Sequence, residues 1–182
     1  MTSIPITISS GAGGDGALDS CDATALDDPV GGSLRSRHAH LARRHGRAAT
    51  YLPDVATFSA VAADPEPQVW SDLAHLLGRG ALADMFSCAE TPPPDWEPVF
   101  ALEGRQMVWA GIASADRCEA GTDVVVLDAE SGPEMRDLVA RTRPGPFWTR
   151  TPELGCYLGI RENGRLVAMA GERMKLTGFT EV

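Results

Sequence analysis

The feature that most constrains the fold of this chain is the pair Asn163-Gly164, which separates two short runs of alternating residues. The runs are CYLGIR at 156–161 and RLVAMA at 165–170. Asn and Gly readily adopt the positive φ angles of a two-residue hairpin turn, so the segment predicts a β-hairpin. Its second strand is expected to continue through GERMKL. Thr177-Gly178 then predicts a turn into a last strand that begins GFTEV.

A strand and a helix are predicted before this hairpin. Residues 123–128, DVVVLD, contain three consecutive valines, which favour a buried strand. Ser131 suits a helix N-cap, and Glu134 places a negative charge at the positive end of the helix dipole. Pro144 ends the helix. The predicted order over 122–182 is therefore strand, helix, strand, strand, strand.

Residues 29–110 predict a smaller α/β unit. Its expected elements are a helix from Pro29 through the segment 33–47, a strand at 47–53, helical stretches at 55–62 and 68–77, and strands at 81–87 and 104–110. Residues 1–28 are rich in Gly, Ser, Asp and Ala and predict a flexible tail. The small and polar run 111–121 predicts a linker.

Composition narrows the class of protein. The four cysteines are far apart and form no CxxC pair, which favours neither a zinc site nor a disulfide framework. The N-terminus lacks the basic and apolar regions of a secretory signal, and no stretch approaches the ~20 apolar residues of a membrane span. We therefore expect a cytoplasmic protein with no membrane partner.

The segment 33–47 holds five arginines and no acidic residue, although the net charge of the chain is −9. The overall acidity argues against a nucleic-acid partner, because phosphate contacts need a basic surface. His38 and His40 cannot share a helical face at this spacing, so no metal site is predicted. A solvated cationic helix is the expected structure, with an anion contact as the alternative.

These elements, with the strings YLGIRENGRLVAMAGER and GFTEV, resemble the N-terminal half of the GNAT superfamily of N-acetyltransferases. The resemblance is to the bacterial branch that carries a degenerate α/β unit ahead of the catalytic half, and it is close over 121–182 and looser over 29–182. It implies an α/β (α+β, mixed-sheet) fold. A small N-terminal α/β unit, 29–110, would precede the first half (β-α-β-β-β) of an acetyltransferase domain, 122–182.

Members of that superfamily transfer an acetyl group from acetyl-CoA directly to an amine, so the resemblance implies acetyl-CoA as co-substrate. The acceptor would be an amine-bearing small molecule, or the N-terminus or a lysine of a protein. In the superfamily the fourth strand binds the pantetheine arm, and an R/Q-x-x-G-x-G/A loop after it binds the pyrophosphate. Val182 is the residue here that would begin the cofactor contacts. We therefore expect residues 1–182 to be a truncated, inactive part of the domain.

The resemblance also implies roles for individual residues. Glu181 lies where relatives place a general base that accepts a proton from the amine. The loop residues Phe147, Trp148, Thr149 and Arg150 would form a wall of the acceptor pocket. Tyr157 and Glu172 are further acceptor-site candidates. The structural alternatives are an exposed strand glutamate for Glu181 and Glu172, a loop anchored by its aromatics, and a sheet residue for Tyr157.

Two further alternatives stay open. The chain could be a non-catalytic remnant or interaction module that never binds acetyl-CoA. An incomplete sheet also leaves an open edge, through which two copies could form a homodimer.

Overall fold

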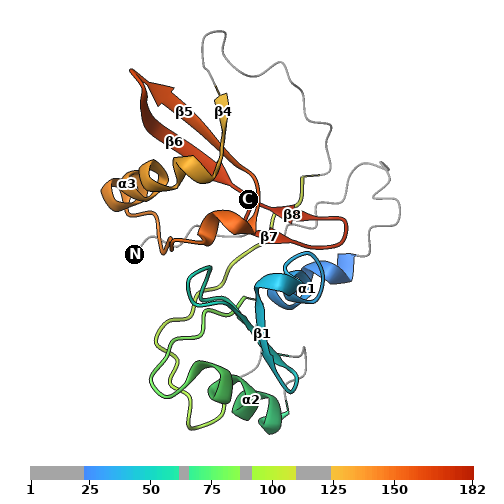
Figure 1. The fold of residues 1–182 in the computed structure, drawn as a ribbon. Helices are drawn as coiled ribbons and strands as arrows, with labels where there is room; N and C mark the ends of the chain where they lie inside the picture. The colour runs from blue at the N-terminus through green and yellow to red at the C-terminus, as the bar shows by residue number, and fades with distance from the viewer. Residues whose placement is uncertain (1–22, 62–65, 87–91, 110–123) are drawn as a thin grey trace.

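The computed structural model describes residues 23–61, 66–86, 92–109 and 124–182 (Figure 1). Residues 1–22 of the predicted tail and the whole predicted linker lie outside the described residues. Residues 23–28, which the sequence assigns to the tail, form the 3-10 helix η1 (Ala23–Leu26) and the N-cap of the next helix, where Asp28 accepts a hydrogen bond from the Gly31 amide at 2.9 Å.

The N-terminal elements form a three-stranded antiparallel sheet in the order β1-β2-β3, with α1 and α2 packed against it. Their bounds are α1 Pro29–Arg35, η2 Ala39–Leu41, β1 Ala42–His45, β2 Ala48–Tyr51, β3 Ser59–Ala60 and α2 Pro67–Leu77. The predicted strand at 47–53 and helix at 68–77 are confirmed. The apolar stripe of α2, which includes Trp70 and Leu73, is buried.

The helix predicted through the arginine segment is wrong beyond Arg35. Residues 42–45 instead form β1, which pairs with β2 around Gly46 at φ +53°. Strand pairing satisfies the backbone groups of this segment, and Leu41 remains fully buried in the core.

Three further predictions in this half are wrong. The stretch 55–61 contains β3 rather than a helix. Residues 81–86 form no strand, and Asp84 makes only an isolated parallel bridge to Phe58. Residues 104–109 form no strand either, and Met107 is 78% exposed, so this stretch gains little of the side-chain packing that stabilises a strand.

The C-terminal elements follow the predicted order. A sheet in the order β4-β5-β6 carries α3 on one face, and a short hairpin, β7-β8, follows it (Figure 1). The bounds are β4 Val124–Leu127, η4 Ala129–Ser131, α3 Gly132–Thr142, η5 Thr151–Leu154, β5 Tyr157–Glu162, β6 Arg165–Gly171, β7 Met174–Lys175 and β8 Thr180–Glu181. The GERMKL extension is thus a separate short strand.

Both predicted turns are confirmed. Asn163 and Gly164 have φ angles of 51° and 78°, and Gly178 has a φ angle of 84°. These are left-handed conformations that Asn and Gly tolerate best. The turns therefore set the register of β5 on β6 and of β7 on β8.

The prediction of a fully buried β4 is wrong. Leu127 is 7% exposed beneath α3, whereas Val126 is 70% exposed on the opposite face of the sheet. Successive side chains of a strand point to opposite faces, and the described residues cover only one face here. Ser131 occupies the predicted N-cap position of α3, but its side chain makes no capping bond; it donates instead to the Asp128 carboxylate at 2.9 Å.

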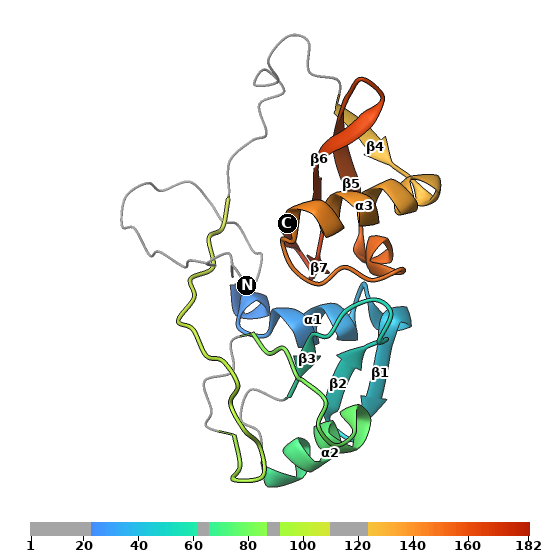
Figure 2. The same cartoon turned by 90° about the vertical axis from the view of Figure 1, so that its left-hand side faces the viewer.

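Residues from the two predicted units share one core. Leu154 and Met174 are buried in the same cluster as Val30, Leu34 and Tyr51. Figure 2 shows α1 between the N-terminal sheet and the β7 hairpin. The division into units at 111–121 stays a prediction. Among the described residues, no helix is long and apolar enough to cross a membrane.

Candidate functional site

Three of the predicted site residues lie at one end of the β5-β6 sheet. Tyr157 begins β5 opposite Gly171, the last residue of β6. Glu172 follows directly, and Glu181 lies on β8 opposite Met174. The hairpin turn at Asn163-Gly164 is at the other end of the same two strands. The β7-β8 hairpin follows at the Tyr157 end, and β7 contacts α1 (Figure 1).

Glu181 is engaged by Arg173 across the β7-β8 hairpin. The Arg173 Nε donates to Glu181 Oε2 at 2.8 Å, and Nη2 donates to Oε1. The Arg173 amide also donates to the Glu181 carbonyl at 2.9 Å. The Glu181 side chain is 15% exposed and that of Arg173 is 37% exposed. The carboxylate is therefore largely sheltered, and its partner is open to solvent.

Two aromatic rings from the N-terminal half lie against Arg173. Its guanidinium carbon is 5.4 Å from the Phe58 ring centre and 5.2 Å from that of Phe86. The two rings contact one another edge to face at 5.2 Å. The parallel bridge at Asp84, in which the Ser59 amide donates to the Asp84 carbonyl at 2.9 Å, places Phe86 beside Phe58. Both distances are within the range of cation–π attraction.

A buried polar network supports this cluster from the core. His38 is 2% exposed, and its Nδ1 and Nε2 lie 2.8 Å from the Tyr51 hydroxyl and the Leu154 carbonyl oxygen. A carbonyl can only accept, so Nε2 carries the proton and the Tyr51 hydroxyl donates to Nδ1. Burial lowers the pKa of His38 and raises that of Tyr51. His38 is therefore a neutral imidazole that joins the two halves of the chain.

Glu172 is held in place by close contacts. Its Oε2 accepts from the Cys156 amide at 2.6 Å and lies 2.6 Å from the Lys175 ammonium. The Cys156 amide first, and Lys175 second, lower the pKa of Glu172. These contacts favour the ionised form of Glu172.

Tyr157 and Phe147 form an aromatic pair over the sheet. The ring centres are 6.0 Å apart in an edge-to-face arrangement, and Tyr157 is 9% exposed. Burial raises the pKa of Tyr157 to about 12. Its ring lies directly over Gly171, where a Cβ atom would overlap it. Both aromatics belong to the core beneath α3, which also contains Met135.

Of the other loop candidates, Arg150 contacts the N-terminal half. Arg150 pairs with Glu153 at 2.6 Å and with Asp54 at 3.5 Å. The Trp148 amide donates to the Thr151 hydroxyl at 2.8 Å, while Thr149 is exposed. The structure therefore does not bring these three residues to Glu181, and Val182 beyond it is 86% exposed.

Sequence reasoning missed Arg173, Phe58, Phe86 and the His38–Tyr51 pair. A signal for Arg173 existed, because the turn at Thr177-Gly178 places it next to Met174, the residue opposite Glu181. Nothing in the sequence indicated Phe58 or Phe86, since they lie 115 and 87 positions from Arg173.

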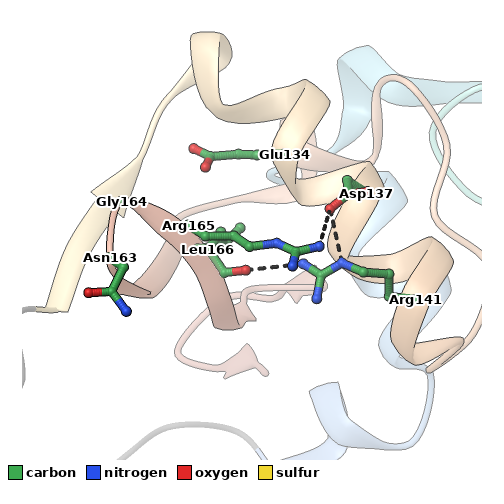
Figure 3. A pocket seen from close by; sticks show the side chains of 7 residues that line it. All are labelled: Glu134, Asp137, Arg141, Asn163, Gly164, Arg165 and Leu166. Atoms are coloured by element: carbon green, nitrogen blue, oxygen red, sulfur yellow. Dashed lines mark hydrogen bonds and ion pairs between the residues drawn. The ribbon is translucent and has the colours of Figure 1, made fainter.

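Figure 3 shows a separate depression of about 300 Å³ at the turn end of the sheet. It is lined by Glu134, Asp137, Arg141, Asn163, Gly164, Arg165 and Leu166. Asp137 pairs with Arg141 at 2.9 Å and with Arg165 at 3.7 Å. The Asp137 carboxylate in the depression therefore already has cationic partners. None of the predicted site residues lines this depression.

The described residues hold no group of three or more His, Cys, Asp or Glu side chains that could bind a metal. One stretch, Arg43–Ala48, has the R-x-x-G-x-A spacing of a pyrophosphate loop. It forms the β1-β2 hairpin rather than a helix N-terminus, so its amides do not converge on an anion.

Comparison with known proteins agrees with this architecture. No protein-family model matches the chain, and no curated protein does. The chain is similar to a crystal structure from Novosphingobium aromaticivorans DSM 12444, described as a "Putative Acetyltransferase from the GNAT family". The two share 28% identity at a TM-score of 0.55, and the match covers 82% of this chain and 65% of that one. The chain thus spans less than two thirds of that protein, and its fold is GNAT-like.

Proposed function

We propose that this chain contributes the amine-acceptor side of an acetyl-CoA-dependent N-acetyltransferase. The observation that carries the proposal is the position of Glu181 on β8 of a GNAT-like fold. Its carboxylate pairs with Arg173, whose guanidinium lies against the Phe58 and Phe86 rings of the N-terminal half. The acceptor is an amine of a small molecule, or the N-terminus or a lysine of a protein. Acetyl-CoA would supply the acetyl group as a thioester.

In this proposal Glu181 accepts a proton from the acceptor amine. An amine attacks a thioester only when neutral, and most amines are protonated near pH 7. Arg173 must release at least one Glu181 oxygen before that carboxylate can receive the proton. Glu172 is a poorer candidate, because it precedes β7 and does not lie on β8, the strand on which GNAT relatives place the general base. The Cys156 amide and Lys175 also engage its Oε2.

The described residues do not fit the pyrophosphate of acetyl-CoA. The stretch Arg43–Ala48 is a hairpin, and the N-terminal turn of α3 carries Glu134, whose negative charge opposes an anion. We therefore derive no step through acetyl-CoA. We expect residues 1–182 alone to show no measurable binding of acetyl-CoA in a calorimetric titration. Micromolar binding by these residues would contradict this expectation.

The test of activity compares variants of two carboxylates, Glu181 and Glu172. The protein used is the polypeptide that carries this chain, together with any sequence encoded after Val182. Release of free CoA thiol is measured with acetyl-CoA and a panel of primary amines. We expect Glu181→Gln to lower kcat/KM by about 10²–10⁴-fold, the range for a general base. The matched control, Glu172→Gln, should lower it far less. Equal loss in both variants would contradict the role of Glu181.

The apolar face of β4 supports a second candidate, a non-catalytic interaction module. Val126 and Leu158 are 70% and 44% exposed on the face away from α3. Exposed apolar residues on one sheet face are typical of surfaces that bind another segment or chain. Absence of thiol release with every amine, in a folded protein that carries an intact acetyl-CoA site, would favour this candidate.

A further inference from the structure

The environment of Arg173 is suited to cations in general. Phe58 and Phe86 present rings at 5.4 and 5.2 Å from the guanidinium carbon, and Glu181 supplies the opposite charge. An ammonium or guanidinium group is attracted to aromatic faces and more strongly to a sheltered carboxylate. The three groups come from segments far apart in the sequence, and Arg173 is the side chain that they share.

Arg173 itself is not sealed in place. Its side chain is 37% exposed, and Phe58 and Phe86 are half-buried, so solvent reaches the guanidinium. Arg173 is not a member of the core cluster that holds Met174, against which Phe58 and Phe86 pack. A cation from solution can therefore compete with Arg173 for the same contacts.

We propose that Phe58, Phe86 and Glu181 form a binding site for the cationic amine of the acceptor, and that Arg173 occupies this site in the absence of acceptor. The inference rests on the proposed function. It adds a role in substrate selection for the N-terminal half, through Phe58 and Phe86. The acceptor arrives as an alkylammonium ion, displaces Arg173, and pairs with Glu181. This pairing puts the ammonium within reach of the carboxylate that accepts its proton.

Displacement of Arg173 can be observed without any acetyl transfer. The chain of residues 1–182 is labelled with ¹⁵N-arginine, and the Arg173 Nε–H signal is followed by NMR during titration with n-butylammonium. The flanking rings shift this signal in the free protein, so displacement should move it saturably toward its solvent-exposed position. The neutral control, n-butanol, has the same length and should leave it unchanged. Equal shifts with both probes, or no shift with either, would overturn the proposal.

Variants separate a binding site from a structural ion pair. Arg173→Leu removes the internal competitor, and we expect its affinity for n-butylammonium, measured by calorimetry, to rise about tenfold. Phe58→Leu and Phe86→Leu should each weaken binding by the wild-type chain about 3- to 30-fold. The matched control is Phe100→Leu, since Phe100 is an aromatic residue that is 69% exposed. Unchanged or weaker binding by a folded Arg173→Leu variant would count against the proposal.

The outcome for this site is distinct from the outcome for acetyl transfer. Selective binding of n-butylammonium with displacement of Arg173, but no thiol release in the activity assay, would retain the cation site and reject the transferase. If thiol is released but the Arg173 signal does not change with n-butylammonium, the proposal of a transferase stands and the proposal of a cation site is wrong. If Arg173→Leu fails to fold, the titration of the unaltered chain still decides between these outcomes.

Discussion

His38 is the buried titratable side chain that couples α1 and β2 to the segment around Leu154. Both of its ring nitrogens make 2.8 Å hydrogen bonds, and the bond from the Tyr51 hydroxyl needs an unprotonated Nδ1. Protonation would remove this acceptor and would put a charge on a ring that is buried away from water. The neutral imidazole is therefore part of the folded structure.

A pH dependence of stability follows from His38. Burial lowers its pKa in the folded chain below the ordinary value of 6.5, so the unfolded chain binds more protons as the pH falls below 6.5. The contribution of His38 to the free energy of unfolding should be constant above pH 6.5. It should decrease as the pH falls below 6.5, and it should level off below the pKa of His38 in the folded chain. Urea unfolding from pH 8 to pH 5 measures it.

The control for this prediction is the exposed His75. We expect His38→Gln to remove the decrease between pH 6.5 and pH 5, and His75→Gln to retain it. Asp72 and Glu172, whose pKa values are lowered, lose their contribution only at more acidic pH, below their ordinary values. The same slope in all three proteins would refute the role of His38.

Gly171 is a second residue whose identity is set by a neighbour. The Tyr157 ring lies against its Cα, so Gly171→Ala forces a Cβ atom into the ring. We expect a loss of about 1–3 kcal/mol in the free energy of unfolding, the usual cost of overpacking. Urea unfolding measures this loss as a lower denaturation midpoint with an unchanged m-value. Gly132→Ala is the control, because its Cβ would meet only the flexible end of Arg136; equal losses would contradict the explanation.

At the scale of elements, the β4-β5-β6 sheet is covered by α3 on one face only. Leu127 and Met135 are buried between sheet and helix, whereas Val126 faces solvent. Stability therefore depends on the alternate residues of β4, not on the apolar run as a whole. The three valines predicted a buried strand, whereas in the structure only alternate residues of β4 are buried.

Substitutions in β4 test that difference. Leu127→Ala removes buried methyl groups and should lower the free energy of unfolding by about 2–5 kcal/mol. Val126→Thr keeps a β-branched residue on the exposed face and should change it by less than about 0.5 kcal/mol. Both are measured by urea unfolding. Comparable losses at the two positions would mean that something covers the outer face of the sheet.

At the scale of the whole molecule, Ser33 joins α1 to the β7 hairpin. Its hydroxyl accepts from the Lys175 amide at 2.7 Å and donates to the Lys175 carbonyl at 2.9 Å. Ser33 is fully buried, so both backbone groups of Lys175 depend on it. This contact lies beside the shared core of Leu34 and Met174.

Loss of this hydroxyl should weaken the link between the two halves. We expect Ser33→Ala to cost about 1–3 kcal/mol, because it leaves the Lys175 backbone groups without their partner. Ser36→Ala is the matched control on the same segment, where the hydroxyl donates to Gly32 at an exposed position. Hydrogen exchange of the Lys175 amide should accelerate in Ser33→Ala and not in Ser36→Ala. Unchanged exchange in both would contradict the proposed link.

The order of the C-terminal elements was predictable because its signals are local. Asn163-Gly164 and Thr177-Gly178 require left-handed backbone, and the helix after β4 has its own start and stop residues. Residues 42–45 and 104–109 were mispredicted for the opposite reason. Whether an apolar or cationic run becomes a strand depends on a partner strand, which lies elsewhere in the chain.

The sequence alone therefore determined the β5-β6 and β7-β8 hairpins, helix α2, helix α3 and the GNAT-like order of the C-terminal elements. Each of the hairpins and helices depends on residues within a few positions. The sequence also placed Glu181 on the last strand. Only the tertiary structure decided what surrounds that carboxylate. Arg173 reaches it across a turn, but Phe58 and Phe86 approach from the other half of the chain. Such contacts arise from the packing of a shared core, and packing brings together residues that no sequence spacing relates.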